Sequence, residues 1–110
     1  MITRYALFEG YVNPAQTEAF RAAVLTEILP KWRAFPGALA VRVCFENERD
    51  QDATEIPLIL AISYADRAAV DSALASPERA EAKAATESVM SRFFKGSIHH
   101  HITVAHDHVL

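Results

Sequence analysis

The sequence lacks most of the features that identify a protein's chemistry at sight. It has one cysteine, Cys44, and three isolated glycines among 110 residues. A single cysteine cannot form an internal disulfide, so the chain fits a reducing compartment better than a disulfide-stapled secreted domain. So few glycines leave no glycine-rich phosphate loop and no nucleophile elbow, and no zinc-protease helix motif is present. These absences argue against the enzyme classes that depend on a phosphate loop, a nucleophile elbow or a zinc-protease helix.

Long apolar runs and blocks of basic charge are also missing. No stretch approaches the roughly 20 apolar residues that span a bilayer. Arg4 and Glu9 interrupt the apolar N-terminal segment, which breaks any signal-peptide core. The net charge is −3 and the pI is about 5.9, which argues against nucleic acid as a partner. We therefore expect a cytoplasmic protein that binds neither nucleic acid nor membrane.

The composition is that of an ordinary folded chain. Hydrophobic residues make up 51% of the sequence and charged residues 23%, which is typical of globular proteins and not of disordered ones. A chain of 110 residues can bury a core of its own but is too short for two domains. We expect a single domain over residues 1–110.

The first part of the chain predicts a strand followed by a helix. Residues 2–12 are rich in aromatic and β-branched side chains, with apolar groups on both faces. Asn13 and Pro14 form a helix start, with Asn13 as the N-cap. Pro30 is expected to end or kink this helix near Ile28. Apolar residues recur along it at helical spacing: Phe20, Val24, Ile28 and Trp32.

The rest of the chain predicts strand, strand, helices and a last strand. An exposed, mobile hairpin loop over 47–55 separates a half-buried strand over 39–48 from an apolar one over 57–65. Asp66 caps a short helix, Ser76 caps a longer one, and the last strand covers 98–109. One face of the first of these strands carries Leu39, Val41, Val43 and Phe45. The buried side of the longer helix is expected to comprise Ala80, Ala84, Val89, Met90, Phe93 and Phe94.

This order of elements predicts an α+β fold of the ferredoxin-like type. It is a βαββαβ sandwich with an antiparallel four-stranded sheet and helices on one face only. The outer strands carry apolar groups on both faces, so the uncovered face needs a partner. A second copy of the same sheet is the simplest partner, and we expect a homodimer.

Three stretches of the sequence resemble a known superfamily. They are the opening strand with Asn13-Pro14, the segment LPKWRAFPGALAVRV, and the segment ISYADRAAVDSALASPERAEA. Together they resemble the dimeric α/β barrel proteins. The third segment is most similar to the ethyl tert-butyl ether degradation (EthD) family, and similar stretches occur in antibiotic-biosynthesis monooxygenases and stress-responsive A/B barrel proteins. The superfamily includes cofactor-free monooxygenases, lactone isomerases and haem-degrading enzymes, so the resemblance indicates a fold more than a reaction.

The resemblance also implies a ligand pocket between the helices and the sheet. His99 and His101 are the candidate catalytic residues, because an imidazole exchanges protons near neutral pH. The candidate substrate-binding residues are Tyr5, Trp32, Arg42 and Tyr64. Their aromatic bodies and polar ends suit a small aromatic substrate. The competing interpretation is that these aromatic residues belong to the core and the interface.

All five histidines of the chain lie between residues 99 and 108. On a strand, His99 and His101 share one face, whereas His100, His106 and His108 share the other. About 23 Å of extended strand separates His99 from His106, so one ion cannot gather all five. We expect no metal site, although a dimer could bring two histidine pairs together.

A bound cofactor is not expected either. Haem-degrading relatives place an axial histidine on the second-half helix, whereas residues 77–94 contain none. Cys44 has no histidine or aspartate pattern around it and is interpreted as structural.

Two functions follow from these observations. The first is a cofactor-independent enzyme, monooxygenase-like or isomerase-like, or an auxiliary protein, that acts on a small aromatic or lactone-like molecule. The alternative is a non-catalytic ligand-binding or stress-related dimeric module.

The predicted last strand, over 98–109, is longer than is usual in a sheet of this size. Its far end, 105–110, is therefore expected to pack against the partner chain, with His106 and His108 at the contact.

Overall fold

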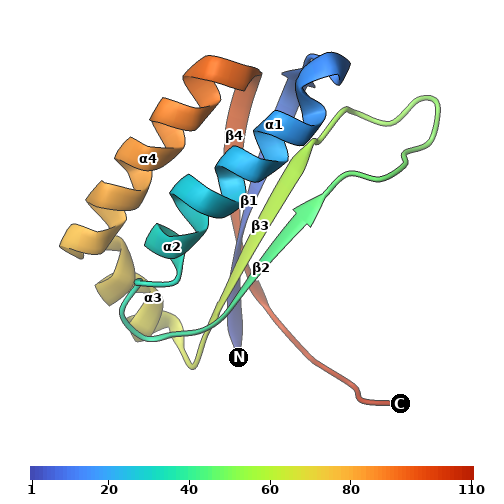
Figure 1. Cartoon of the computed structure of the whole chain (residues 1–110). Helices are drawn as coiled ribbons and strands as arrows, with labels where there is room; N and C mark the ends of the chain where they lie inside the picture. Colours follow the sequence, from blue (N-terminus) through green and yellow to red (C-terminus); the bar gives the residue numbers. More distant parts are fainter.

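The computed structural model describes all 110 residues and has two layers (Figure 1). All helices cover one face of a four-stranded antiparallel sheet with the order β2-β3-β1-β4. This is the α+β ferredoxin-like sandwich that the sequence predicts. The strands are β1 (Ile2–Val12), β2 (Ala38–Phe45), β3 (Leu58–Tyr64) and β4 (Phe94–Val104). The helices are α1 (Thr17–Ala23), α2 (Leu29–Trp32), α3 (Arg67–Leu74) and α4 (Pro77–Phe93), with a 3-10 turn at Pro14–Gln16.

The first helix begins as predicted. Of the two outcomes predicted for Pro30, the helix does not end before the proline but is distorted there. Asn13 Oδ1 accepts a hydrogen bond of 3.0 Å from the Ala15 amide. Between α1 and α2 the chain makes a π-helical turn, Val24–Ile28, in which the Leu29 amide bonds to the Val24 carbonyl. The wider turn absorbs Pro30, which lacks an amide hydrogen. Trp32 is thereby carried onto the buried side of the same helical layer.

The two later helices have the predicted caps. Asp66 Oδ1 accepts from the Ala69 amide at 2.9 Å, and Ser76 Oγ accepts from the Arg79 amide at 3.3 Å. The predicted buried side of α4 was partly wrong, because Ala80 and Ala84 are exposed. Alanine occurs on all sides of this helix and therefore gives no directional signal. Val89 and Met90 are buried as predicted, Ala82 takes the place of the two exposed alanines, and Phe94 already belongs to β4.

The β2 strand contains an irregularity that the alternation did not reveal. Ala38 pairs with Tyr64 and Ala40 with Ser63, so Leu39 is an extra residue in a bulge. Leu39 is 61% exposed and not part of the buried face predicted for it.

The predicted last strand was wrong at both ends. β4 starts at Phe94 and pairs with β1 along its whole length, from Phe94 opposite Val12 to Val104 opposite Ile2. The Ala105 amide makes a last bond of 3.0 Å to the Met1 carbonyl. Beyond it β1 offers no further partner, so 106–110 are not in a strand and run away from the body of the molecule (Figure 1).

The two faces of the sheet differ, and we name them for what covers them. The helix face packs against the helices and holds the core, which includes Phe8, Phe20, Ile28, Leu58 and Val89. The open face carries no helix (Figure 1). Strand alternation and register give the open face Thr3, Tyr5, Leu7, Glu9, Tyr11, Arg42, Cys44, Ile59, Ala61, Ser63, Ser97, His99, His101 and Thr103. None of the helices is both long and apolar enough to cross a membrane.

Candidate functional site

A cleft lies on the helix face, between α4 and the β1–β4 side of the sheet. Its volume is about 180 Å³. Apolar side chains from the sheet and the α2 region form its floor, and charged side chains of α4 form one wall. The lining residues are Arg4, Ala6, Phe8, Trp32, Phe35, Leu60, Ile62, Arg79, Ala82, Lys83, Thr86, Glu87, Ile98 and His100. We call this the sheet–α4 cleft.

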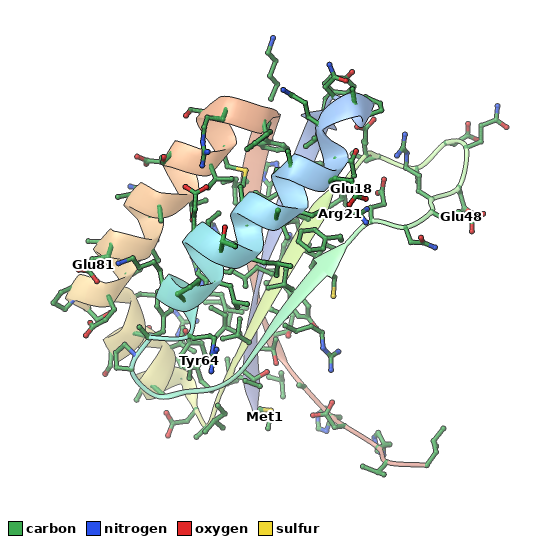
Figure 2. The ribbon with its side chains drawn as sticks, viewed as in Figure 1. Met1, Glu18, Arg21, Glu48, Tyr64 and Glu81 are labelled. Atoms are coloured by element: carbon green, nitrogen blue, oxygen red, sulfur yellow. The ribbon has the colours of Figure 1, made fainter.

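One face of α4 supplies the polar wall. Positions 79, 82, 83, 86 and 87 follow the spacing of neighbours on one side of a helix. Ala82 is buried against the sheet at the centre of this face. Around it, Arg79, Lys83 and Glu87 carry charge to the cleft, whereas Glu81 points away from α4 into solvent (Figure 2). The small alanine thus leaves the space that the longer side chains border.

The sheet contributes two polar groups to an otherwise apolar surface. Arg4 on β1 and His100 on β4 both point to the helix face, because they pair opposite Ile62 and Ala6. Burial, followed by the charge of Arg79, lowers the pKa of Arg4. Burial also lowers the pKa of His100, with further contributions from Arg4, Arg79 and then His99. The lowered pKa favours the unprotonated form of the His100 imidazole, which borders the cleft from the edge strand β4 and is partly exposed to water.

Tyr64 lies on the helix face, on the side of the sheet near α2 (Figure 2). It is fully buried. Burial raises its pKa, and the positive charge of Arg4 opposes that shift. Tyr64 is therefore a neutral phenol close to the cleft, and it is not a counter-ion for Arg4.

The structure divides the six predicted site residues between the two faces of the sheet. Trp32 lines the sheet–α4 cleft and is 3% exposed, and Tyr64 lies near it on the same face. The other predicted residues lie on the open face. Arg42, Tyr5 and His101 form one row there, with Ala61 between the first two, and His99 lies in the next row. One pocket between helices and sheet cannot contain all six, because the sheet separates them.

The open face has its own polar cluster at β1 and β4. His99 Nε2 lies 3.1 Å from Glu9 Oε2 and 3.1 Å from Ser97 Oγ. Both contacts use the same ring nitrogen. In a nucleophilic triad the acid and the serine bind opposite nitrogens of the imidazole, so this cluster does not have the geometry of a triad. Cys44 is exposed on the same face.

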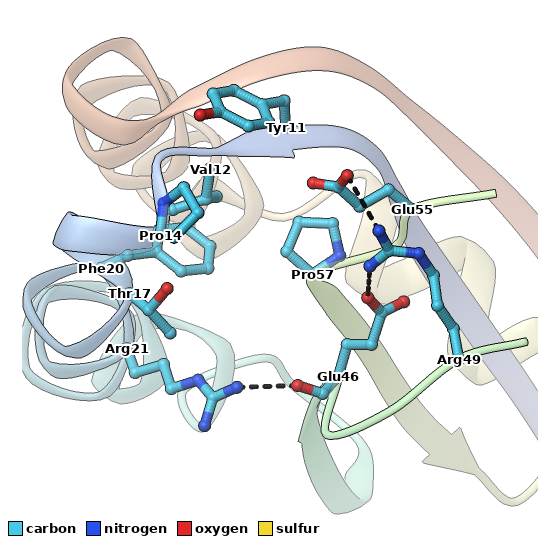
Figure 3. Close-up of a pocket in the computed structure, with 10 residues that line it drawn as sticks. All are labelled: Tyr11, Val12, Pro14, Thr17, Phe20, Arg21, Glu46, Arg49, Glu55 and Pro57. Atoms are coloured by element: carbon cyan, nitrogen blue, oxygen red, sulfur yellow. Dashed lines mark hydrogen bonds and ion pairs between the residues drawn. The ribbon is translucent and has the colours of Figure 1, made fainter. Parts of the chain in front are cut away.

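A second hollow of about 220 Å³ lies where the β2–β3 loop meets the start of α1 (Figure 3). Arg21 Nη2 donates a hydrogen bond of 2.7 Å to the Glu46 carbonyl. Arg49 bridges the Glu46 and Glu55 carboxylates at 2.6 and 3.3 Å. The charged side chains of this hollow are thus engaged within the chain, Arg21 with a backbone carbonyl and Arg49 with two carboxylates, and the Arg21 contact connects the β2–β3 loop to α1.

No three histidine, cysteine, aspartate or glutamate side chains lie close enough to hold one metal ion. The histidines are dispersed: His99 and His101 lie on the open face, His100 lies in the cleft, and the last two lie in the segment after β4. This distribution follows from strand alternation and from the end of β4 at Val104.

Sequence reasoning missed three residues of the cleft: Arg4, Arg79 and His100. A usable signal was present for the two strand residues. Arg4 lies between Ile2 and Ala6 on an apolar strand face, and His100 lies between Ile98 and Ile102. A polar residue on an otherwise buried strand face indicates either an ion pair or a site. Arg79 had no comparable signal, because α4 is polar on several sides.

No protein-family model and no curated protein matches this sequence. Solved structures do match over nearly the whole chain. An EthD-family protein from Bacillus halodurans is 19% identical, with a TM-score of 0.70 over 96% of this chain and 99% of its own. SnoaB, a cofactor-independent oxygenase from Streptomyces nogalater, is 18% identical, with a TM-score of 0.59 over 98% and 95%. A dimeric ferredoxin-like protein of unknown function from Bacteroides fragilis is 12% identical, with a TM-score of 0.64 over 93% of each chain.

These neighbours confirm the resemblance at the level of fold. The chain has the ferredoxin-like architecture shared by EthD-family and monooxygenase-like proteins, as the three sequence segments indicated. Identities below 20% transfer the fold and not the reaction, which has to be argued from the site.

Proposed function

We propose that this chain is a small cytoplasmic homodimer and a cofactor-independent enzyme, monooxygenase-like or isomerase-like, that acts on a small aromatic or lactone-like molecule. The sheet–α4 cleft is its substrate site. The observation that carries this proposal is that the His100 imidazole lines the same cleft as an aromatic floor and two guanidinium groups. The lowered pKa of His100 favours its unprotonated form. The fold shared with a cofactor-independent oxygenase supports it.

The cleft holds the parts that proton-transfer chemistry needs. An isomerase moves a proton from one carbon to another, and a cofactor-free oxygenation requires an electron-rich phenolate or carbanion. Both reactions begin with the removal of a proton, and His100 is the proposed base, because it lines the cleft and its lowered pKa favours the unprotonated form. Arg4 and Arg79 supply positive charge to the same cleft, which favours an anionic substrate.

His99 and His101 are a second proposal for acid–base groups. They lie on the open face, away from the sheet–α4 cleft, together with Tyr5 and Arg42. On this face they would work only in a site completed by a second subunit. We therefore assign the first role to His100 and treat the row Arg42, Tyr5 and His101 as the competing site.

The experiment uses the three consecutive histidines as matched variants. Wild-type protein is screened by thermal shift against aromatic acids, quinones and lactones, and hits are titrated by the fluorescence of Trp32, the only tryptophan. His100→Gln is expected to lower turnover by about 10²–10⁴-fold, as loss of a general base does. His99→Gln and His101→Gln are expected to leave turnover near wild type. The reverse pattern would move the active site to the open face.

A non-catalytic ligand-binding or stress-related module is the second candidate. The observation in its favour is that aromatic rings fill the α1 end of the space between helices and sheet. Phe20 contacts Phe93 edge to face, and Phe8 contacts Phe94 in the same way, both with centroids 6.1 Å apart. This candidate predicts that hits bind with no turnover and that His100→Gln leaves their affinity unchanged.

The homodimer is proposed from the open face. A sheet with one uncovered, partly apolar face favours pairing with a second copy, and one structural neighbour is a dimeric protein of this fold. Residues 105–110 extend from the edge of the sheet (Figure 1), with Val109 and Leu110 fully exposed. We propose that this segment packs on the partner, as predicted for it, although not as a strand of its own subunit.

A further inference from the structure

We propose that the ligand of the sheet–α4 cleft is a one-ring aromatic carboxylate, and that Arg4 and Arg79 bind its carboxylate group. This inference rests on the proposed function and deepens it, because it names the charge and the size of the substrate. It concerns two arginines that approach the cleft from different elements, Arg4 from β1 and Arg79 from α4.

Neither arginine has a partner within the chain. Arg4 and Arg79 occur in no ion pair and in no hydrogen bond made by their side chains. Most other arginines are engaged: Arg21 with a carbonyl, and Arg49, Arg67 and Arg92 with carboxylates. Arg33 and Arg42 are unpaired but exposed, so water satisfies them. Arg4 and Arg79 are half-buried, and a half-buried guanidinium without an anion is an unfavourable arrangement.

The charge around the cleft has the opposite sign to the charge of the chain. Arg4, Arg79 and Lys83 line it, and Glu87 is its only carboxylate. The whole chain carries a net charge of −3. The two arginines also repel one another, which contributes to the lowered pKa of Arg4 after the larger contribution of burial. A carboxylate bound between them would remove this repulsion and would accept hydrogen bonds in the fork geometry that guanidinium favours.

The floor and the volume of the cleft define the rest of the ligand. Phe8, Trp32 and Phe35 offer aromatic surface, and Leu60 and Ile62 complete an apolar floor. A dry cavity of about 150 Å³ is known to hold benzene, so the 180 Å³ of this cleft suits one ring with a small substituent. A single aromatic ring that carries a carboxylate is the smallest ligand that both contacts the apolar floor and pairs with the two arginines.

The test compares two probes that differ in charge and share the ring. Wild-type protein is titrated at pH 7.5 with 4-nitrobenzoate and with 4-nitrobenzyl alcohol, and quenching of Trp32 fluorescence is measured. We expect the carboxylate to bind at least about tenfold more tightly than the alcohol, as one charge-assisted contact implies. Arg4→Gln and Arg79→Gln are each expected to remove this preference. Arg79→Lys, which keeps the charge, is expected to retain part of it.

Arg33→Gln is the matched control, because Arg33 is also unpaired but is exposed and does not line the cleft. It is expected to keep the full preference. Equal affinity for the two probes, unchanged by either arginine variant, would overturn the carboxylate assignment and leave the cleft as a binding site. Absence of binding by both probes at millimolar concentration would overturn the proposed function of the cleft as well. If Arg4→Gln fails to fold, Arg79→Gln on the helix wall decides the question.

Discussion

The two faces of the sheet use the same four strands for different purposes. On the helix face, Phe8 and Leu58 are almost completely buried, at 2% and 0% exposure. On the open face, Leu7 and Ile59 lie in the neighbouring positions and are only half-buried. A change of one residue along β1 therefore moves a side chain from the core to a surface that a second chain would have to cover.

The polar groups of the two faces differ even more clearly than the apolar ones. On the open face they are either paired, as His99 is with Glu9 and Thr3 Oγ1 is with Ser63 Oγ, each at 3.1 Å, or exposed to water, as Arg42 is. On the helix face, Arg4 has no partner and lies in a cleft. Satisfied polar groups suit an assembly surface, whereas unpaired ones next to an apolar floor suit a ligand. The comparison supports the two proposals, assembly through the open face and a ligand site on the helix face.

The largest expected effect comes from truncating the core side of β1. Phe8→Ala removes a ring that is buried against the core and that contacts Phe94 edge to face. We expect a loss of about 3–5 kcal/mol in the free energy of unfolding, because the helices cannot close over the space left behind. Chemical denaturation at several protein concentrations measures it, and the loss should not depend on concentration.

Leu7→Ala is the matched variant on the other face of the same strand. At low protein concentration, where subunits are separate, it is expected to cost about 1 kcal/mol or less, as half-buried positions do. A loss as large as that of Phe8→Ala under those conditions would mean that the two faces are equally covered within one subunit, contrary to the comparison.

The next effect concerns assembly. Leu7→Lys places a charge at the centre of the open face, between Ile59 and His99 on the neighbouring strands. We expect the dimer dissociation constant to rise at least about tenfold, because a charge would be buried without a partner. Sedimentation velocity across a dilution series measures it.

The control for this substitution is Leu25→Lys, since Leu25 is an exposed leucine of the helical layer. It is expected to leave the dissociation constant unchanged. Loss of the dimer with Leu25→Lys but not with Leu7→Lys would move the interface to the helices. Removal of 105–110 is expected to weaken the dimer as well, and an unchanged dimer would remove that segment from the contact.

The sequence was sufficient for the fold because the fold depends on signals that are local. β1 was predicted to the residue by its aromatic and β-branched content, and three caps were readable from Asn13, Asp66 and Ser76. The failures arose where a distant partner decides. β4 ends at Val104 because β1 offers no further pairing, and Leu39 leaves the buried face because of a bulge in its pairing with β3.

The site was harder to predict than the fold for the same reason. Alternation correctly separated His99 and His101 from His100. It did not say which side the helices cover, so His99 and His101 were predicted in the pocket between helices and sheet, whereas they lie on the open face. Trp32 was predicted in that pocket and lies there, because its helical stripe could face only the core. Arg79 required the three-dimensional position of α4.

The smallest expected effect is the pH dependence that His100 gives to stability. The pKa of His100 in the folded chain is lower than its ordinary value near 6.5, chiefly because of burial and then because of Arg4, Arg79 and His99. Below that ordinary value the unfolded chain therefore binds more protons at this position than the folded chain does. The free energy of unfolding should fall as the pH is lowered from about 6.5 through the folded pKa. Above about pH 7 the imidazole is unprotonated in both states, and His100 should cause no pH-dependent change in stability. Lys83 and Glu87 also line the cleft and carry charges of opposite sign. His100→Gln should flatten this part of the profile in thermal melts from pH 7.5 to 5, whereas His101→Gln on the open face should leave it intact. If the slope vanished with His101→Gln instead, the titrating imidazole would lie on the open face, and the assignment of chemistry to the helix face would be wrong.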